Sequence, residues 1–381
     1  MRARPAVALL IETSNAYARG LLEGIMAYVR EHKPWSIYLP EQGRGAAPPA
    51  WLARWKGDGL IVRVETKEIA RAVVRKRKPV VDVSAGRFIP SIPWVETDDQ
   101  AIAKAAAAHL LERGFRRLAF CGDARFNWSK HRRTSFEALA REAGAELHVH
   151  DAPLAQEHDA LVAWVRRLPK PVGVFAAYDI KAQQLLDACR DAGVAVPEEV
   201  AVVGVDNDEL LCRLATPPLS SVVPNTGRTG YEAARLLDRL LRGEKVAPEA
   251  HLVPPLGVHA RQSTDILAVE DREVAAAMRF IREHACDGIT VEDVLRAVPL
   301  SRRVLERRFR KVARRTPHEE ILRLRLERVK QLLAESDLSL ERISTLAGFA
   351  HPEYMSVAFK REVGVTPGCH RLQIRPQKGR A

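Results

Sequence analysis

Long hydrophobic runs are missing from this chain of 381 residues. No apolar stretch reaches the roughly 20 residues that a helix needs to cross a membrane. The apolar run at 6–11 is too short for the core of a secretory signal, and polar residues follow it directly. We therefore expect a cytoplasmic protein that has no membrane partner.

Cysteine pairs and catalytic signatures are missing as well. The five cysteines are odd in number and far apart, and none belongs to a C-x-x-C pair, which is typical of a reducing compartment and argues against a zinc module. The signatures of phosphate-binding loops, dinucleotide-binding folds, serine hydrolases and zinc proteases do not occur. We predict no metal, no cofactor and no enzymatic activity, although a scattered active site would leave no such signature.

Positive charge is concentrated in the last third of the chain. The net charge is +12, and residues 271–381 hold 23 Lys and Arg against 15 Asp and Glu. Residues 1–270 hold 37 against 33. A basic region beside a nearly neutral body indicates a polyanionic partner, with a solvated basic surface as the alternative.

The first 260 residues alternate short apolar strands with helical patterns. We predict strands at 5–12, 35–39, 58–64, 79–83, 117–122, 172–177 and 200–205. Helices are predicted at 16–32, 67–78, 98–114, 130–144, 155–168 and 178–193. Continuous apolar strands separated by helices indicate a parallel sheet covered on both faces. Because the pattern restarts near residue 98, we predict two lobes with a cleft between them.

Polar side chains follow several of these strands. They are Ser14, Asn15, Asp179, Asp206 and Asn207, and Arg63 lies within the strand predicted at 58–64, next to its end. Ligands of such sheets bind beyond the carboxyl ends of the strands, and carboxylates and amides suit a polyhydroxylated ligand because each makes several hydrogen bonds. A helix N-cap is the alternative role for any one of them. For Trp51 and Trp55, the sequence does not decide between a place in the core and a place in the cleft.

Residues 5–262 resemble the periplasmic-binding-protein-like sensor domains of LacI/GalR-type repressors. The resemblance rests on the lobe pattern and on the segments HRRTSFEAL at 131–139, VAVVGVDNDEL at 200–210 and PPLSSVVPNTGRTGYEAARLL at 217–237. It implies that Arg132, Asp179 and Asp206 contact a sugar. Those repressors begin with a helix-turn-helix, whereas this chain opens almost directly on its first predicted strand.

A helix-turn-helix pattern occurs twice near the other end. In the first copy Thr290 and Ser301 are placed as N-caps on either side of a break, and in the second copy Ser339 is an N-cap and Gly348 forms the turn. Three pairs recur at a spacing of 50: Phe309 and Phe359, Thr316 and Thr366, Pro317 and Pro367. The segment 317–336 is predicted to join the copies as one helix of roughly 27 Å. Two recognition helices could then enter successive major-groove segments on one face of DNA.

Residues 270–373 resemble the DNA-binding domain of the AraC family. The motifs are LERISTLAGF, AFKREVGVTP and the arginine at 325 with the leucine pair that ends at Leu333. The base-facing positions that the resemblance implies are Arg303, Glu306, Arg307, His351, Glu353, Ser356 and Val357. The predicted DNA-binding set also includes Ser301, Arg302, Arg310 and Lys360. For Arg302, Arg308, Arg310 and Lys311, phosphate contact and simple solvation are both open.

A LacI/GalR-like sensor ahead of an AraC-type reader is the arrangement of the bacterial xylose-operon activators, which the chain resembles along nearly all its length. We therefore predict an α/β two-lobed domain at 1–265, with lobe one at about 5–97 and 225–260 and lobe two at about 98–224. An all-α domain with two helix-turn-helix units is predicted at 266–381. Arg63 stands where an acidic residue is expected in that family, which makes a sugar acid or another pentose plausible.

The predicted function is sugar-responsive, sequence-specific DNA binding that activates genes of carbohydrate catabolism. The expected partners are a double-stranded operator, a small sugar or sugar acid, a second copy of the chain packed through lobe one, and RNA polymerase as a candidate. Two alternatives belong to other classes. One is a DNA-architectural protein whose first domain only dimerises, and the other is a sugar-modifying enzyme fused to a basic domain.

Overall fold

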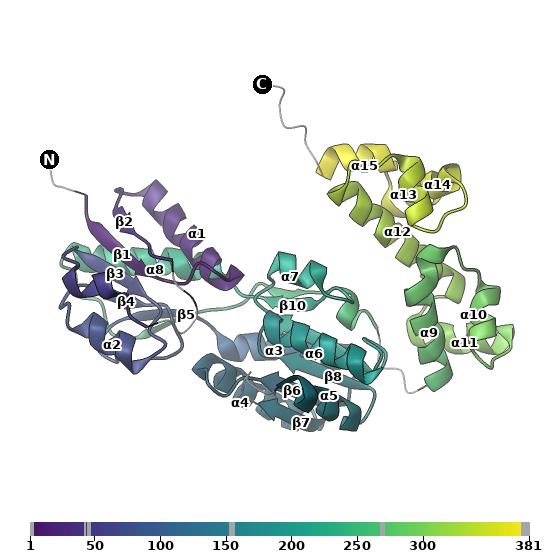
Figure 1. The fold of residues 1–381 in the computed structure, drawn as a ribbon, viewed down its shortest axis with the longest axis horizontal. Helices are drawn as coiled ribbons and strands as arrows, with labels where there is room; N and C mark the ends of the chain where they lie inside the picture. Colours follow the sequence, from purple (N-terminus) through teal and green to yellow (C-terminus); the bar gives the residue numbers. More distant parts are fainter. Residues whose placement is uncertain (1–3, 42, 44–46, 152–156, 267–270, 375–381) are drawn as a thin grey trace. The chain divides into compact units, whose positions relative to one another are not determined.

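The computed structural model describes residues 4–41, 43, 47–151, 157–266 and 271–374. The chain divides into two compact units, Met1–Asp265 and Ile266–Ala381. The described residues of unit 1 form an α/β domain, and those of unit 2 form helices (Figure 1). Within the described ranges, no helix combines the length and apolar character that spanning a lipid bilayer requires.

The first sheet of unit 1 forms lobe one, and its strand order is β11-β5-β4-β3-β1-β2. All of its strand pairs are parallel. The strands are β1 (Ala6–Leu10), β2 (Ser36–Tyr38), β3 (Gly59–Val62), β4 (Val80–Asp82), β5 (Trp94–Thr97) and β11 (Ala250–Val253). The helices of this lobe are α1 (Ala16–Glu31), the 3-10 helix η1 (Ala50–Arg54), α2 (Lys67–Val74) and α8 (Thr226–Leu241).

The second sheet forms lobe two, with the order β12-β10-β9-β8-β6-β7. Its pairs are parallel except for β12, which runs antiparallel to β10. The strands are β6 (Arg117–Gly122), β7 (Glu146–Asp151), β8 (Val172–Ala176), β9 (Val200–Val205), β10 (Ser220–Val223) and β12 (Gly257–His259). The helices are α3 (Asp99–Glu112), α4 (Asn127–Glu142), α5 (Glu157–Arg167), α6 (Asp179–Ala192), α7 (Glu209–Leu214) and the 3-10 helix η2 (Gln262–Thr264).

Both faces of each sheet are covered, which explains why the strands are apolar without alternation. In lobe one, Val7 and Leu9 of β1 pack with α1 and α8. Ala8 and Leu10 of the same strand pack on the opposite face with α2 and η1. Trp51 and Trp55 are partly buried against this second cluster, so they belong to the core.

Helices α1 and α8 lie side by side because glycines remove the side chains between them. A Cβ atom at Gly24 would lie 1.9 Å from the carbonyl oxygen of Gly227, and one at Gly230 would lie 2.0 Å from that of Leu21. The two backbones therefore touch directly, which fixes α1, and the residues that precede it, against the sheet.

Unit 2 contains two helix-turn-helix units joined by a long helix. Its helices are α9 (Arg272–His284), η3 (Ala285–Asp287), α10 (Val291–Ala297), α11 (Arg302–Ala313), α12 (Pro317–Glu335), α13 (Leu340–Leu346), α14 (Pro352–Val363) and α15 (Pro367–Ile374). The first unit is α10 with α11, and the second is α13 with α14. Left-handed residues end the two second helices at equivalent places, Arg314 (φ 58°) and Gly364 (φ 85°), 50 residues apart.

The strands and helices predicted from periodicity all occur, with shifts of a few residues at their ends, and the two parallel α/β lobes are confirmed. The start of the helix predicted at 155–168 lies outside the described residues. Five short strands were missed, β5, β7, β10, β11 and β12. The lobe-one range 225–260 also needs correction, because β12 hydrogen-bonds to β10 in the sheet of lobe two.

Gly24→Ala should destabilise unit 1 by about 1–3 kcal/mol, because the new methyl group must push α8 away from α1. Gly227→Ala is the matched control, since its Cβ would meet nothing within 4 Å. That change should stabilise unit 1 by about 0.4–1 kcal/mol through a less flexible unfolded chain. Urea unfolding followed by circular dichroism measures both, and equal effects of the two substitutions would contradict the close helix contact.

Candidate functional site

A pocket in unit 1 collects polar and aromatic side chains from both lobes. It contains about 420 Å³ of empty space, part of it open to solvent. Its charged lining residues are Arg63, Glu96, Asp99, Arg132 and Asp206, and its aromatic ones are Tyr17, Trp128 and Tyr178.

Arg63 follows β3 and is nearly buried between two carboxylates. Its Nη1 donates to Glu12 Oε2 at 2.8 Å and its Nη2 to Glu65 Oε1 at 2.6 Å. The guanidinium also lies over the ring of Tyr17, 5.1 Å from its centroid. Burial opposes the charge of Arg63, but Glu65 and Glu12 outweigh it and hold the pKa of the guanidinium above its ordinary value. Arg63 is therefore a fixed cation whose charge is already balanced.

Arg132 of α4 is fixed in a similar way on the lobe-two side. Its Nε donates to Asp99 Oδ1 at 2.8 Å and its Nη1 to the carbonyl oxygen of Ala177 at 2.6 Å. The guanidinium lies 5.1 Å from the ring centroid of Trp128. These contacts leave Arg132 only 3% exposed, so its orientation is set before any ligand arrives.

Two buried polar atoms of the lining have no hydrogen-bond partner in the described part of the chain. They are Glu96 Oε2 and Arg63 Nε. The other oxygen of Glu96 accepts a hydrogen bond from Arg87. Burial raises the pKa of Glu96, and Arg87 opposes this rise. An unpaired buried acceptor and donor are costly, and a ligand that carries hydroxyl groups can satisfy both.

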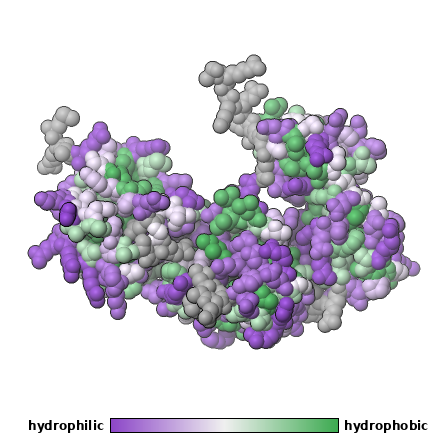
Figure 2. Space-filling view, in the orientation of Figure 1, coloured by the Kyte–Doolittle hydropathy of each residue, from purple (hydrophilic) through white to green (hydrophobic). Residues whose placement is uncertain are grey.

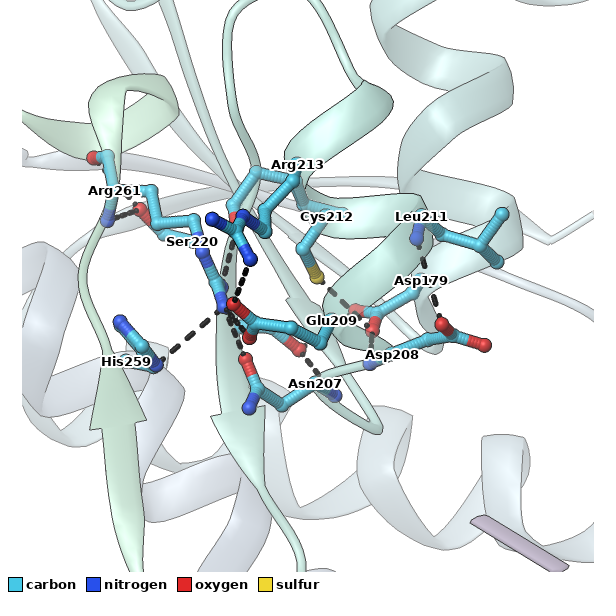
Figure 3. A network of polar contacts seen from close by, with 12 residues as sticks. Asp179, Asn207, Asp208, Glu209, Leu211, Cys212, Arg213, Ser220, His259 and Arg261 are labelled. Carbon is cyan, nitrogen blue, oxygen red and sulfur yellow. Dashed lines mark hydrogen bonds and ion pairs between the residues drawn. The ribbon is translucent and has the colours of Figure 1, made fainter. Parts of the chain in front are cut away.

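Asp206 and Asn207 follow β9 in backbone conformations that are rare for residues with a side chain. Their φ angles are 111° and 46°. The neighbouring backbone is held by Asp179, which accepts hydrogen bonds from Ser221 Oγ at 2.6 Å and from the Asp208 N–H at 2.8 Å (Figure 3). Burial, followed by the charge of Asp206, raises the pKa of Asp179 well above its usual range. Asp179 thus supports the turn that presents Asp206 to the pocket.

The structure brings together three of the six predicted ligand residues, Arg63, Arg132 and Asp206, in the pocket lining. Asp179, Asn15 and Asn207 lie outside the lining. Asn15 caps α1, and its Oδ1 accepts from the Ala18 N–H at 2.8 Å, while its Nδ2 is buried without a partner among the described residues. Asn207 Oδ1 accepts from Arg261 Nη2 at 2.8 Å.

Sequence reasoning missed Glu96 and Asp99, and it did not single out the aromatic residues of the pocket. Glu96 is in β5, a strand of four residues that periodicity did not reveal, and Asp99 is the first residue of α3. The run of acidic and hydroxyl residues in ETDD at 96–99 is a signal that could have located them, because such residues seldom follow an apolar strand without a role in capping or binding.

Asp82, at the end of β4, holds backbone and side-chain groups next to the pocket. Its Oδ1 accepts hydrogen bonds from the Val64 N–H at 3.2 Å, the Ser84 N–H at 3.0 Å and Ser84 Oγ at 2.8 Å. Ser84 lines the pocket. Asp82 is almost fully buried, and this burial raises its pKa to about 7.

In unit 2, α11 presents a cationic face. A surface hollow along it is lined by Arg302, Arg303, Glu306, Arg307, Arg310, Lys311 and Arg314. Arg303, Arg307 and Arg310 are exposed and make no side-chain hydrogen bond or ion pair with the described residues. Arg302 instead pairs with Glu306 at 3.1 Å and Glu292 at 2.7 Å. Three guanidiniums are therefore available to a polyanion.

Arg308 has a structural role. Its Nε and Nη2 donate to the two carboxylate oxygens of Asp271, each at 2.5 Å, and Nη2 also donates to Glu273 at 3.0 Å. Asp271 is the N-cap of α9. Arg308 therefore fixes α11 to α9. Its guanidinium is engaged by these carboxylates, whereas the sequence had left phosphate contact open for it.

On α14, the predicted residues lie on the exposed side of the helix. His351 is the N-cap, and His351, Glu353 and Lys360 are exposed, as is Val357 at 67%. Ser356 is half-buried. Met355 and Phe359 on the other side are buried in the core of this unit, as the sequence predicts.

The two helix-turn-helix units are locked together by Arg325 of α12. Its Nε donates to the carbonyl oxygen of Ala285 and its Nη2 to that of Ile289, both at 2.7 Å. Its guanidinium also lies 5.8 Å from the ring centroid of Phe349, in the turn of the second unit. At the neighbouring Gly348 (φ 75°), a Cβ would lie 2.7 Å from the Cys286 backbone. The turn of the second unit is thus packed against the residues that precede the first.

Comparisons with known proteins agree with this organisation. Three family models match: a XylR N-terminal domain at residues 6–100, a periplasmic binding protein-like domain at 107–264 and a helix-turn-helix domain at 294–373. The chain is 33% identical to the xylose operon regulatory protein of Haemophilus influenzae, over 96% of this chain and 98% of that protein. It is 34% identical to that of Escherichia coli, with 97% of each chain covered.

The chain belongs to the family of xylose operon regulatory proteins. A solved structure described as the xylose-binding transcription activator XylR matches with a TM-score of 0.83 and 33% identity, covering 97% of this chain and 98% of that one. A periplasmic binding protein/LacI transcriptional regulator from Alkaliphilus metalliredigens in complex with D-xylulofuranose matches with a TM-score of 0.56 and 20% identity, covering 68% of this chain and 98% of that one, which shows the shared fold alone. The predicted fold class and family are thereby confirmed.

Asp82→Asn should remove a pH-dependent loss of stability. The pKa of Asp82 is about 7 in the folded protein and about 3.8 ordinarily, so the folded state retains the proton more tightly. The contribution of Asp82 to stability should therefore be largest below about pH 4, fall between about pH 4 and 7, and stay low above. The asparagine keeps an Oδ1 for the same three donors and cannot ionise.

Urea unfolding of both proteins at pH 5 and pH 8 measures this effect. We expect Asp82→Asn to gain on the order of 1–3 kcal/mol over the parent protein between the two pH values. Parallel pH profiles of the two proteins would show that Asp82 is ionised at no cost in the folded state.

Proposed function

We propose that this protein is a sugar-responsive, sequence-specific DNA-binding activator of transcription, and that its effector is xylose or a related neutral sugar. The proposal depends on the combination of two parts in one chain. A domain whose two lobes line a pocket with unsatisfied hydrogen-bonding atoms is followed in the sequence by two helix-turn-helix units. The printed names of its relatives, which are xylose operon regulatory proteins and a xylose-binding transcription activator, support the same function.

The charge balance of the pocket favours a neutral sugar over a sugar acid. Arg63 alone would favour an acid, but Glu12 and Glu65 already neutralise it. The lining holds three carboxylates, from Glu96, Asp99 and Asp206, against the guanidiniums of Arg63 and Arg132. A ligand carboxylate would therefore lose its hydration and meet an excess of negative charge.

The unpaired atoms indicate how such a sugar is held. A hydroxyl group can donate a hydrogen bond to the carboxylate oxygen Oε2 of Glu96 and can accept one from the N–H at Nε of Arg63. Asp206 accepts from hydroxyl groups on the lobe-two side. The rings of Tyr17, Trp128 and Tyr178 provide the apolar surface that the C–H face of a sugar requires.

Unit 2 is proposed to read the operator through α11 and α14. Arg303 and Arg307 can donate two hydrogen bonds to guanine, and Arg310 and Lys311 are placed to contact phosphates. Helix α12 has 19 residues and so spans roughly 28 Å. This length is comparable to the roughly 34 Å repeat of DNA, which suits two recognition helices in successive major-groove segments.

A homodimer in the cytoplasm, with RNA polymerase as a further partner, completes the proposal. The resemblance to the sensor domains of LacI/GalR-type repressors favours a dimer surface on lobe one. Lobe two offers a further apolar surface, because Leu210 and Leu214, one turn apart on α7, are 68% and 70% exposed. Figure 2 shows a group of hydrophobic side chains over α7. Apolar surface of this kind is typical of protein contacts.

The effector proposal is tested by thermal shift and calorimetry with D-xylose, L-arabinose, D-ribose, D-glucose and D-xylonate. We expect a neutral pentose to bind and D-xylonate to bind at least tenfold more weakly. Glu96→Gln and Asp206→Asn should each weaken pentose binding by roughly 10- to 100-fold, the loss of one charged hydrogen bond. Glu68→Gln, at an exposed position of α2, is the control and should bind as the parent does. Preferential binding of D-xylonate would contradict the argument from charge.

The DNA proposal is tested with an operator that the protein itself selects from a random-sequence library. Arg307→Ala should cost about 1–3 kcal/mol and relax the choice of one base pair. Lys311→Ala should weaken all sequences alike and lower the salt slope by roughly 0.9. Arg296→Ala, an exposed arginine of α10, is the control. If the double variant Arg303→Ala, Arg307→Ala selected the same operator sequence as the parent, α11 would not read bases.

A further inference from the structure

The last residues of unit 1 are held inside lobe two. We call 261–265 the exit segment, because unit 2 begins at Ile266. Ser263 and Thr264 are fully buried. Ser263 Oγ donates to the Val202 carbonyl oxygen of β9 at 2.6 Å, and Arg113 Nε donates to that of Thr264 at 2.7 Å. The exit segment therefore follows any movement of β9 and of the end of α3.

Arg261 is the first residue of the exit segment and contacts the turn after β9. Its Nη2 donates to Asn207 Oδ1 and to Glu209 Oε2, both at 2.8 Å, and its Nη1 donates to the Leu219 carbonyl oxygen at 2.9 Å (Figure 3). Its side chain is only 9% exposed.

The backbone of Arg261 is tied to the sheet as well. Its N–H donates to Ser220 Oγ at 2.7 Å, and the same hydroxyl lies 2.9 Å from the Arg261 carbonyl oxygen and 2.7 Å from Thr264 Oγ1. Ser220 is the first residue of β10. Side chain and backbone of Arg261 thus join the Asn207 turn to the exit segment through a few short bonds.

The other end of this network is in the pocket. Asp206, which lines it, immediately precedes Asn207, and both have positive φ. Such conformations persist only where surrounding contacts enforce them. The Asp206 N–H donates to the Val222 carbonyl oxygen at 3.2 Å and the Asn207 N–H to Ser221 Oγ at 3.0 Å. The Asp206–Asn207 turn could adopt other backbone conformations of lower energy. A ligand hydroxyl bonded to Asp206 adds one more contact to this turn and so changes the balance between its conformations.

We propose that Arg261 is the positioning residue that couples occupancy of the pocket to the exit segment, and hence to unit 2. The inference rests on the proposed function, because it needs a sugar in the pocket and DNA on unit 2. Ligand contact with Asp206 shifts the Asp206–Asn207 turn, the Asn207 amide passes the shift to the guanidinium, and the bonds to Ser220 pass it to the exit segment. The size of the coupling is the factor by which sugar changes the Kd for DNA.

The test measures this factor with D-xylose and the selected operator, in the full chain. For the parent protein we expect a factor between about 5 and 150 in either direction. Asn207→Gly removes only the amide that meets Arg261, since glycine adopts positive φ without strain. Arg261→Lys keeps the charge but cannot bridge the three acceptors at once. In both variants the factor should fall below twofold.

Three further measurements separate coupling from stability. The Kd for operator without sugar and the Kd for xylose without operator should stay within about threefold of the parent in Asn207→Gly. A merely structural role would lower the melting temperature and leave the factor unchanged. Glu209→Gln is the matched control, because it alters the exposed partner of the same Nη2 and should keep the factor within twofold of the parent.

The outcomes distinguish this inference from the proposed function. A parent that binds xylose and operator, with equal coupling in Asn207→Gly and Arg261→Lys, would refute the role of Arg261 and leave the proposed function intact. A parent that binds none of the neutral sugars of the panel, or whose operator binding is not altered by the sugar that it binds, would overturn both. Loss of coupling in the two variants and its retention in Glu209→Gln would support the inference.

Discussion

Burial of both faces of each sheet decides where chemistry can occur in unit 1. Strands β3, β8 and β9 are buried along their whole length, so a polar side chain within them would lose its hydration without compensation. Polar residues of these three strands therefore emerge at the carboxyl ends, and the pocket is built there. Arg63 follows β3, Ser84 follows β4 and Asp206 follows β9. The same constraint explains why each cation of the pocket has its own carboxylate.

Periodicity was enough to predict the two lobes, because a strand covered on both faces leaves a continuous apolar run that needs no knowledge of its neighbours. It failed for β5, a strand of four residues whose last two are Glu96 and Thr97. The pocket residues of this strand were lost with it. Residues that recur at a spacing of 50 predicted the second domain for a different reason. Each helix-turn-helix unit has a small core, so Phe309 and Phe359 must recur at the same place.

Residue type and position could not separate the ligand residues from those that support them. Asn15 and Asp206 both follow strands, yet Asn15 caps α1 while Asp206 lines the pocket. Arg307 and Arg308 are adjacent on α11, but helical geometry turns them about 100° apart, so that Arg308 pairs with Asp271. The difference depends on the rotation of each helix and on partners far away in the sequence, which no local pattern encodes.

The pocket combines a rigid part and a strained part, and a regulator needs both. Arg63 and Arg132 are oriented by buried ion pairs, so contacts with them cost little ordering and contribute affinity in every state of the protein. Such contacts cannot change an equilibrium, because a ligand shifts two states only by its difference in affinity for them. That difference must come from groups that move. Asp206, which lines the pocket, and its neighbour Asn207 have unfavourable φ angles and a link to the exit segment, so they are suited to supply it.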